Sequence, residues 1–235
     1  MQKGKLYLIP STIGETPVDV VIPAYNREVI NQIKIYIVEE IRTARRFLKK
    51  AGLIKSIDEL TFFVLNEHSK PEEIDNYLDA IHKGENIGLL SEAGVPCIAD
   101  PGADIVSIAQ QNGIEVVPLV GPSSILLALM ASGFNGQQFT FLGYLPVDKN
   151  LRITKIKEIE RNVFQKNETQ IFIETPYRNN QLIESLLQTC RSETLLCIAT
   201  DITLSTAFIK TKTIAAWKKS VPDFHKKTTV FLLYK

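Results

Sequence analysis

Histidine and cysteine are scarce in this chain of 235 residues, which contains three of each. The histidines are scattered and form no H-E-x-x-H arrangement, the spacing that puts two zinc ligands on one face of a helix. The cysteines have neither C-x-x-C nor any other metal-ligand spacing. We therefore expect no metal site and no disulfide framework, and we interpret the cysteines as small buried side chains in a reducing compartment.

Long apolar runs are also missing. The longest run, around Ile125 to Ala131, is too short to cross a bilayer, which takes about 20 apolar residues in a helix. The first residues lead directly into a strand-like stretch that ends at Pro10, without the apolar core and small-residue cleavage site of a signal peptide. These absences predict a cytoplasmic protein with no membrane partner.

The common nucleotide and hydrolase motifs do not occur. The chain has no G-x-G-x-x-G after its first strand-like segment and no G-x-x-x-x-G-K-[ST], which disfavours a dinucleotide enzyme and a P-loop NTPase. It has no G-x-S-x-G elbow either, which disfavours an α/β-hydrolase.

The charge is balanced overall but divided unevenly. The net charge is +1, yet residues 1–148 carry a net charge of −6 and residues 149–235 a net charge of +7. The overall charge is therefore not that of a strongly basic nucleic-acid-binding protein. The excess of positive charge in residues 149–235 suggests a polyanionic partner for the second half.

Hydrophobic patterning predicts two α/β domains. In the first half, strand-like segments alternate with helical ones, as in a parallel sheet. The strands are expected over 6–10, 33–38, 61–65, 86–90 and 114–119, and the helices over 42–50, from 71 onward and over 103–111. A hinge is expected at 120–122, which gives an N-terminal domain of residues 1–119 and a C-terminal domain of residues 120–235.

The second half has a different order of elements. Helices are expected over 123–131, 152–164 and 179–188, and strands over 138–142, 170–174, 194–199 and 228–233. Because the later strands follow one another closely, we expect a mixed sheet in this domain.

Three loops are candidates for ligand binding because each follows a predicted strand, and open α/β sheets bind ligands at the carboxyl ends of their strands. They span residues 10–14, 91–102 and 121–124. The second loop has two glycines, two prolines and two acids, a composition that permits close approach of the backbone to a flat polar ligand. Glycine and proline also mark tight loops that bind nothing, so this loop alone decides little.

Five segments, in the same order, are similar to motifs of one family. They are Gly4 to Pro10 (G-K-L-Y-L-I-P), Leu89 to Gly102 (L-L-S-E-A-G-V-P-C-I-A-D-P-G), Val116 to Ser123 (V-V-P-L-V-G-P-S), Phe141 to Pro146 (F-L-G-Y-L-P) and Ile171 to Arg178 (I-F-I-E-T-P-Y-R). On these segments the chain resembles the tetrapyrrole methylase superfamily, and within it the small-subunit ribosomal RNA cytidine ribose 2′-O-methyltransferases. The similarity extends over nearly the whole chain.

The resemblance implies a cofactor and its contacts. It implies that the two domains hold S-adenosylmethionine in the cleft between them and that the protein is a homodimer acting on ribosomal RNA. The contacts implied for the first domain and the hinge are Pro10, Glu92, Gly94, Val95, Pro96, Ile98, Ser123 and Ser124. Those implied for the second domain, by position alone, are Ala199, Thr200 and Thr229.

Methyl transfer to a ribose hydroxyl is helped by a base that removes the hydroxyl proton. The candidate catalytic residues are Glu92, Glu40 and Glu174, with Arg42 to pair with a phosphate or to orient a carboxylate. A capping or salt-bridging role is the alternative for each acid. The same predicted helix carries five basic residues that meet either RNA backbone or only solvent, namely Arg42, Arg45, Arg46, Lys49 and Lys50. Of these, Arg42, Arg45 and Lys49 share a face by three- and four-residue spacing.

Two other functions stay open, because the chain departs from the branch at segments matched to the substrate. Residues 11–15 read S-T-I-G-E where the branch has T-P-I-G-N, and residues 199–203 read A-T-D-I-T where it has A-R-E-L-T. The alternatives are methylation of a tetrapyrrole or another small molecule, and binding of RNA or cofactor without catalysis.

Overall fold

The structure is a computed structural model that describes residues 3–66, 69 and 74–235. It divides into two compact units, residues 1–123 and 124–235. The start of the helix predicted from Pro71 lies outside the described residues.

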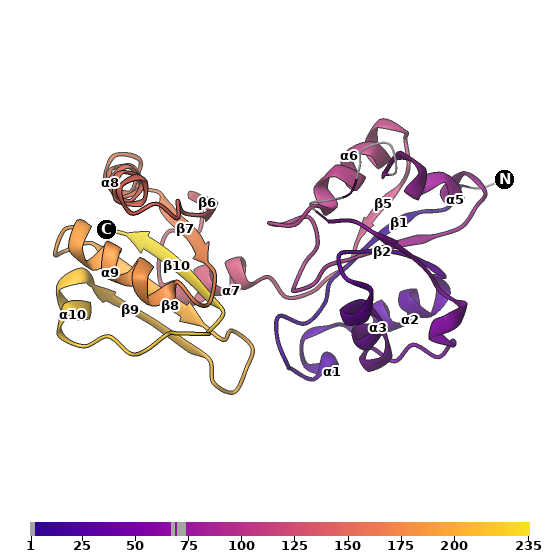
Figure 1. Ribbon diagram of the computed structural model, residues 1–235, viewed down its shortest axis with the longest axis horizontal. Helices are drawn as coiled ribbons and strands as arrows, with labels where there is room; N and C mark the ends of the chain where they lie inside the picture. The colour runs from indigo at the N-terminus through magenta and orange to yellow at the C-terminus, as the bar shows by residue number, and fades with distance from the viewer. Residues whose placement is uncertain (1–2, 67–68, 70–73) are drawn as a thin grey trace. The chain divides into compact units, whose positions relative to one another are not determined.

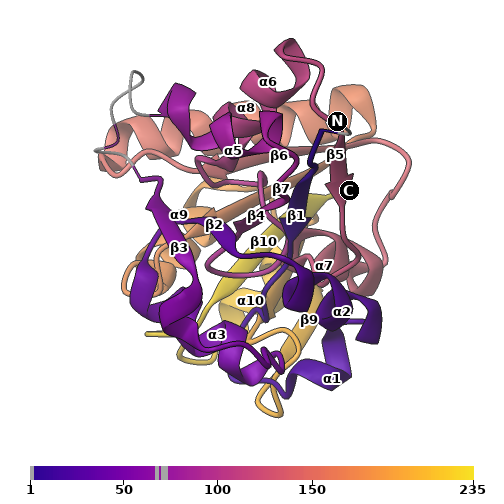
Figure 2. The same ribbon diagram turned by 90° about the vertical axis from the view of Figure 1, so that its right-hand side faces the viewer.

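The first unit contains a five-stranded sheet in which every neighbouring pair of strands is parallel (Figure 2). Across the sheet, the strands are β3 (Thr61–Val64), β2 (Ile35–Val38), β4 (Ile87–Leu90), β1 (Leu6–Ile9) and β5 (Val116–Pro118). The predicted parallel sheet is therefore confirmed.

Helices cover both faces of this sheet (Figure 1). In chain order they are α1 (Val18–Val21), α2 (Ala24–Gln32), α3 (Ile41–Lys50), the 3₁₀ turns η1 (Ile57–Glu59) and η2 (Asp75–Leu78), α5 (Asp79–His82) and α6 (Gly102–Gln111). Successive strand residues point to opposite faces. Ile9 and Tyr36 accordingly pack with α2 and α3, whereas Leu6 and Ile37 pack with α5 and α6.

This arrangement creates a topological switch around β4. The chain leaves β1 and β2 toward the face covered by α2 and α3, but it leaves β4 toward the face covered by α6. Strand β4 lies between β2 and β1, and the chain leaves it toward the opposite face from the one taken after its two neighbours. Open α/β sheets bind ligands at such a point, outside the carboxyl ends of the strands.

The second unit contains a mixed five-stranded sheet, as predicted. Its order is β6 (Phe139–Tyr144), β7 (Thr169–Glu174), β10 (Thr229–Tyr234), β8 (Leu195–Thr200) and β9 (Phe208–Thr213). Strands β6 and β7 are parallel, and the remaining neighbours are antiparallel.

The helices of the second unit divide between the two faces of its sheet. They are α7 (Ser124–Ser132), α8 (Lys149–Lys166), α9 (Asn179–Thr189) and α10 (Ile214–Lys219). Helices α8, α9 and α10 pack on one face around Trp217, Phe172 and Phe231. Helix α7 packs on the other face, against Val230 and Leu232 of β10.

Besides the short α1 and η1, three elements were not predicted from the sequence. Helix α2 (A-Y-N-R-E-V-I-N-Q) follows Pro23 and buries only Asn26, Val29 and Ile30, so its apolar stripe is too short to recognise. Strand β9 (F-I-K-T-K-T) is the edge of its sheet and buries none of its residues completely, and α10 follows it directly. Elements with little buried surface give a weak periodic signal.

The side chain of Asn179, which is fully buried, ties α9 to the segment that leads into β10. Its Nδ2 donates to the carbonyls of Phe224 (3.0 Å) and Lys227 (2.7 Å) and to Thr229 Oγ1 (3.0 Å). Asn179→Ala leaves these acceptors without their donor, and we expect it to lower the free energy of unfolding by about 1–3 kcal/mol in urea titrations.

The control is Gln181→Ala, which removes an exposed amide from the same helix and should cost less than about 0.5 kcal/mol. Equal costs for the two variants would contradict the role given to Asn179.

Candidate functional site

The loops after β1 and β4 are joined at the switch point of the first unit. The Ser11 N–H donates to the Gly94 carbonyl at 2.9 Å, and the buried Pro10 precedes it at the end of β1. This bond lies beyond the last paired residues of the β1–β4 ladder, Ile9 and Leu90. The sheet therefore brings together Pro10 and the 91–102 loop, as the positions of these segments after neighbouring strands suggest.

The 91–102 loop is braced by one carboxylate. Asp100 accepts hydrogen bonds from the backbone N–H groups of Cys97 (2.9 Å) and Gly102 (2.8 Å). Gly94, Cys97 and Ala99 have φ values of +78°, +67° and +64°, so the loop turns through three left-handed residues, two of which carry a side chain. A Cβ at Gly94 would lie 2.9 Å from the Pro122 carbonyl oxygen.

The sequence-predicted cofactor residues of the first unit lie along this loop or at the start of the segment that follows the sheet. Ile98 is half exposed, Val95 is partly buried and Pro96 is buried. Ser123 immediately precedes α7, and Ser124 is its first residue.

A small pocket lies where these loops meet α3, and we refer to it as the α3 pocket. Its volume is about 170 Å³. Its walls are residues 11–15, residues 90–92 and one face of α3, formed by Thr43, Ala44, Arg46, Phe47 and Lys50. Ser11 is 3% exposed, and its hydroxyl oxygen is buried without a hydrogen-bond partner among the described residues.

The four candidate catalytic residues occupy different environments. Glu92 lines the α3 pocket, where its Oε1 accepts a 2.6 Å hydrogen bond from Thr43 Oγ1. Glu40 instead caps α3, accepting 2.9 Å hydrogen bonds from the N–H groups of Arg42 and Thr43. These bonds hold the pKa of Glu40 below its usual range, which makes it a weaker base. The side chain of Arg42 is exposed.

Glu174 lies in the second unit and is engaged in an ion pair. Its Oε1 accepts from Arg178 Nη2 at 2.6 Å and from the Thr175 N–H at 2.6 Å, and its side chain is 1% exposed. Glu40 therefore has the capping role and Glu174 the salt-bridging role that were the alternatives to catalysis. Glu92 is the candidate carboxylate whose contacts leave it facing a pocket.

The second unit aligns three of the predicted residues. Thr229 of β10 is directly opposite Glu174 of β7 on one side and Thr200 of β8 on the other. Thr229 Oγ1 accepts from Asn179 and donates to the Lys227 carbonyl at 3.2 Å, so it is occupied by structural bonds. Ala199 points to the opposite face of the sheet, where it packs with α7.

Several lining residues were not predicted as site residues, although the sequence contained partial signals. Ser11 lies in the first candidate loop, but nothing in the sequence indicates that its hydroxyl is buried. On α3, the pocket is lined by positions 43, 44, 46, 47 and 50 rather than by the face of Arg42, Arg45 and Lys49. Arg46 and Lys50 were expected to meet RNA backbone or solvent, whereas Thr43, Ala44 and Phe47 were not singled out. Arg45 instead lies over the ring of Phe62, 5.5 Å from its centroid.

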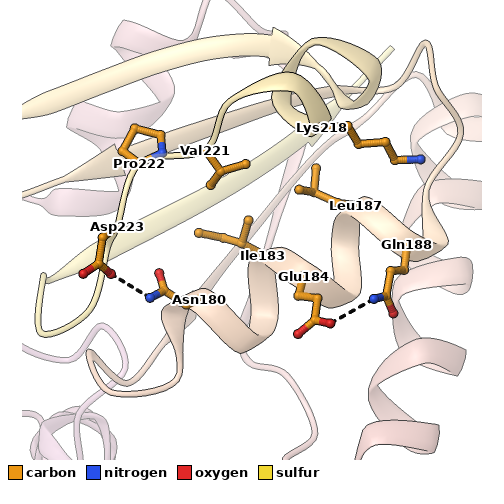
Figure 3. Close-up of a pocket in the computed structure, with 9 residues that line it drawn as sticks. All are labelled: Asn180, Ile183, Glu184, Leu187, Gln188, Lys218, Val221, Pro222 and Asp223. Atoms are coloured by element: carbon orange, nitrogen blue, oxygen red, sulfur yellow. Dashed lines mark hydrogen bonds between the residues drawn. The ribbon is translucent and has the colours of Figure 1, made fainter.

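A larger groove, of about 640 Å³, lies in the second unit between α9 and residues 218–223 (Figure 3). Its polar side chains pair with one another, Asn180 with Asp223 at 2.7 Å and Gln188 with Glu184 at 2.9 Å. Ile183, Leu187 and Val221 form its apolar part (Figure 3). It contains none of the sequence-predicted residues, so size alone does not make it the candidate site.

The fold and the switch-point loops define a class of protein, the two-domain α/β proteins with a ligand crevice at the strand ends of a parallel sheet. Within the described residues no helix is long and apolar enough to cross a membrane. The profile of one family, Tetrapyrrole (Corrin/Porphyrin) Methylases, matches residues 18–216. The chain belongs to this family, whose methyl donor is S-adenosylmethionine.

Two similar proteins carry the name "Ribosomal RNA small subunit methyltransferase I". The protein of that name from Vibrio cholerae is 30% identical over 84% of this chain and 65% of its own length. The one from Haemophilus influenzae is 30% identical over 90% of this chain and 70% of its own length. The chain thus spans about two thirds of the length of these relatives.

Solved structures agree on the fold. The methyltransferase CobJ superposes with a TM-score of 0.65 at 15% identity, over 99% of this chain and 94% of its own. Uroporphyrin-III-C-methyltransferase from Thermus thermophilus gives 0.55 at 17% identity, over 100% and 93%. At these identities the likeness concerns the fold alone.

Glu39, at the end of β2, gives a pH-dependent test of the site's electrostatics. Burial, then the charges of Asp100 and Glu92, raise the pKa of its carboxyl, although the Glu92 N–H donates to it. The folded state therefore binds this proton more tightly than the unfolded chain does, and stability is lost as the pH rises through the raised pKa. We expect Glu39→Gln to raise Tm at about pH 7.5 and to change it little at about pH 4, below the ordinary glutamate pKa.

Glu28→Gln, at an exposed position of α2, controls for the change in net charge. Thermal unfolding followed by circular dichroism at both pH values measures the effect. A Tm gain that is the same at the two pH values would show that the charge of Glu39 is not its cause.

Proposed function

We propose that the chain is an S-adenosylmethionine-dependent methyltransferase that acts on a ribose 2′-hydroxyl of small-subunit ribosomal RNA. The observation that carries the proposal is the gathering of Ser11, Thr43 and Glu92 at the carboxyl ends of β1, β2 and β4, in a member of a methylase family. The names of the sequence relatives support ribosomal RNA as the acceptor. The ribose hydroxyl rests on the sequence motifs.

The residues that would hold the cofactor fit a ligand with a polar and an apolar part. In the first unit these are Pro10, Glu92, Gly94, Val95, Pro96, Ile98 and Ser123, and Ser124 follows as the first residue of the second unit. The left-handed turns of the 91–102 loop present backbone groups, and the half-exposed Ile98 offers an apolar contact. In the second unit the positional candidates stay Ala199, Thr200 and Thr229. Thr200 is fully buried, and its hydroxyl makes one long bond, 3.5 Å to the Phe208 carbonyl. The cofactor supplies a methyl group on a sulfonium, a good leaving group.

Glu92 is the proposed base. Thr43 donates to one of its carboxylate oxygens, which fixes the side chain beside the pocket. The carboxylate would accept the proton of the acceptor hydroxyl as the oxygen attacks in line. Glu40, Arg42 and Glu174 stay predictions, and the contacts of Glu40 and Glu174 favour structural roles for both acids.

Location and assembly belong to the same proposal. A cytoplasmic location accords with a ribosomal RNA substrate and with three cysteines that are all free thiols. Homodimer formation is supported by large apolar side chains that the second unit exposes at Met130, Tyr144, Val147 and Leu151. Light scattering during size-exclusion chromatography tests the dimer.

Gly94→Arg tests the cofactor site. The substitution places a long side chain in the loop at a left-handed φ and against the Pro122 carbonyl. We expect wild-type protein to bind S-adenosylmethionine saturably in calorimetric titrations, and the variant to bind at least about 100-fold more weakly, a loss of about 2.7 kcal/mol.

Gly133→Arg is the matched control. Gly133 has the same φ of +78°, and no atom of the described residues lies within 4 Å of a Cβ built there, so the backbone strain is repeated away from the site. Equal loss in both variants would assign the effect to strain. A folded wild-type protein that binds no S-adenosylmethionine would refute the methyltransferase proposal, and labelled small-subunit RNA after incubation with methyl-labelled cofactor would support the acceptor.

A further inference from the structure

We propose that the α3 pocket binds one nucleotide of the RNA substrate through its sugar and an adjoining phosphate. In this proposal Ser11 and Glu92 bind the ribose hydroxyls, and Arg46 binds the phosphate. The inference rests on the proposed function, because it specifies which part of an RNA acceptor the first unit recognises.

The unpaired hydroxyl of Ser11 is the first observation. Its oxygen is buried and has no hydrogen-bond partner among the described residues, and Ser11 is one of the residues that line the pocket. Nearly all buried polar groups in proteins are hydrogen-bonded, so an unpaired one at a pocket wall indicates a group that arrives with the ligand. A ribose 2′-hydroxyl both donates and accepts, and a serine hydroxyl can pair with it in either direction.

Glu92 and Thr43 restrict the chemistry further. Thr43 donates to Oε1 of Glu92, and an ionised carboxylate only accepts hydrogen bonds. This end of the pocket therefore selects a donor such as a sugar hydroxyl and repels a phosphate. An apolar ligand would leave the Glu92 carboxylate without a donor from the ligand.

Arg46 supplies the complementary charge at the next turn of α3. Three residues of helix separate it from Thr43, a rise of about 4.5 Å, comparable to the spacing of neighbouring groups within one nucleotide. Lys50 is already paired with Glu15 at 2.6 Å. Arg46 is exposed and its charge acts on Glu15, which also lines the pocket, but no hydrogen bond holds its guanidinium within the described part of the chain. The guanidinium can therefore bind a phosphate with two parallel hydrogen bonds.

The α3 pocket is large enough for part of a nucleotide but small for a complete cofactor-sized molecule. Sites for complete small molecules have volumes of about 300–1,000 Å³. The α3 pocket, at about 170 Å³, is smaller than this range. A sugar with one phosphate suits it better than a complete S-adenosylmethionine or a tetrapyrrole macrocycle.

Binding of short single strands tests the proposal without requiring turnover. The probes are a fluorescein-labelled cytidine pentaribonucleotide and its deoxy counterpart, measured by anisotropy in the presence of S-adenosylhomocysteine. We expect wild-type protein to prefer the ribose form by about five-fold, the value of one hydrogen bond. Ser11→Ala should reduce this preference to about one.

Arg46→Gln should act differently from Ser11→Ala. It should weaken binding of both probes by a similar factor, about five- to ten-fold, and lower the slope of log K against log salt by about 0.7, the value of one phosphate on a single strand. Lys34→Gln is the control, because Lys34 is exposed and precedes the amino end of β2, whereas the pocket lies at the carboxyl ends of the strands. This substitution should change both affinities less than two-fold.

The outcomes separate this proposal from the proposed function. Ser11→Ala removes an unpaired group, so Tm should stay equal or rise, and loss of folding would contradict the proposal. A wild-type protein without ribose preference, or a Ser11→Ala variant that keeps it, overturns the pocket assignment. Methyl labelling of small-subunit RNA by wild-type protein is scored independently. Labelled RNA together with an unchanged Ser11→Ala preference would leave the methyltransferase standing and refute the pocket alone.

Discussion

The parallel pairing of β1 with β4 at the centre of the first sheet is the constraint on which the site depends. It places the ends of two strands side by side, although one lies near residue 9 and the other near residue 90. The connections that follow leave toward opposite faces of the sheet. The backbone cannot fill the space between two diverging connections, and the Ser11–Gly94 hydrogen bond fixes the entrance to that space. The position of Glu92 follows from it, and the pairing of β2 with β4 brings Thr43 and Arg46 of α3 to the same place.

The second sheet imposes a different order on its polar residues. Antiparallel pairing puts Glu174, Thr229 and Thr200 in one row, on the face covered by α8, α9 and α10. Arg178 donates to Glu174, and Asn179 donates to Thr229. The row is therefore held mainly by the fold of the second unit, and Thr200 is its least constrained member.

The sequence allowed the two α/β domains and the character of both sheets to be predicted, because buried strands leave a clear apolar pattern. It did not reveal β9, whose K-T-K-T alternation reflects an edge strand with little buried surface. The candidate loops after β1 and β4 were also predictable from glycine, proline and their positions after strands. The roles of individual side chains were less accessible. Glu40 and Glu92 are both acids after predicted strands, and only the structure distinguishes a helix cap from a pocket wall.

The braced 91–102 loop has a consequence for the cost of binding. A loop that becomes ordered only when its ligand arrives loses conformational entropy at that moment, and its affinity is reduced accordingly. Here Asp100 holds two backbone N–H groups, and the chain turns through left-handed residues at Cys97 and Ala99. These are contacts of the loop with itself, so folding supplies the order of the loop. Its strained conformation is thus a stability cost borne by the whole first unit, which leaves a rigid surface ready for whatever binds there.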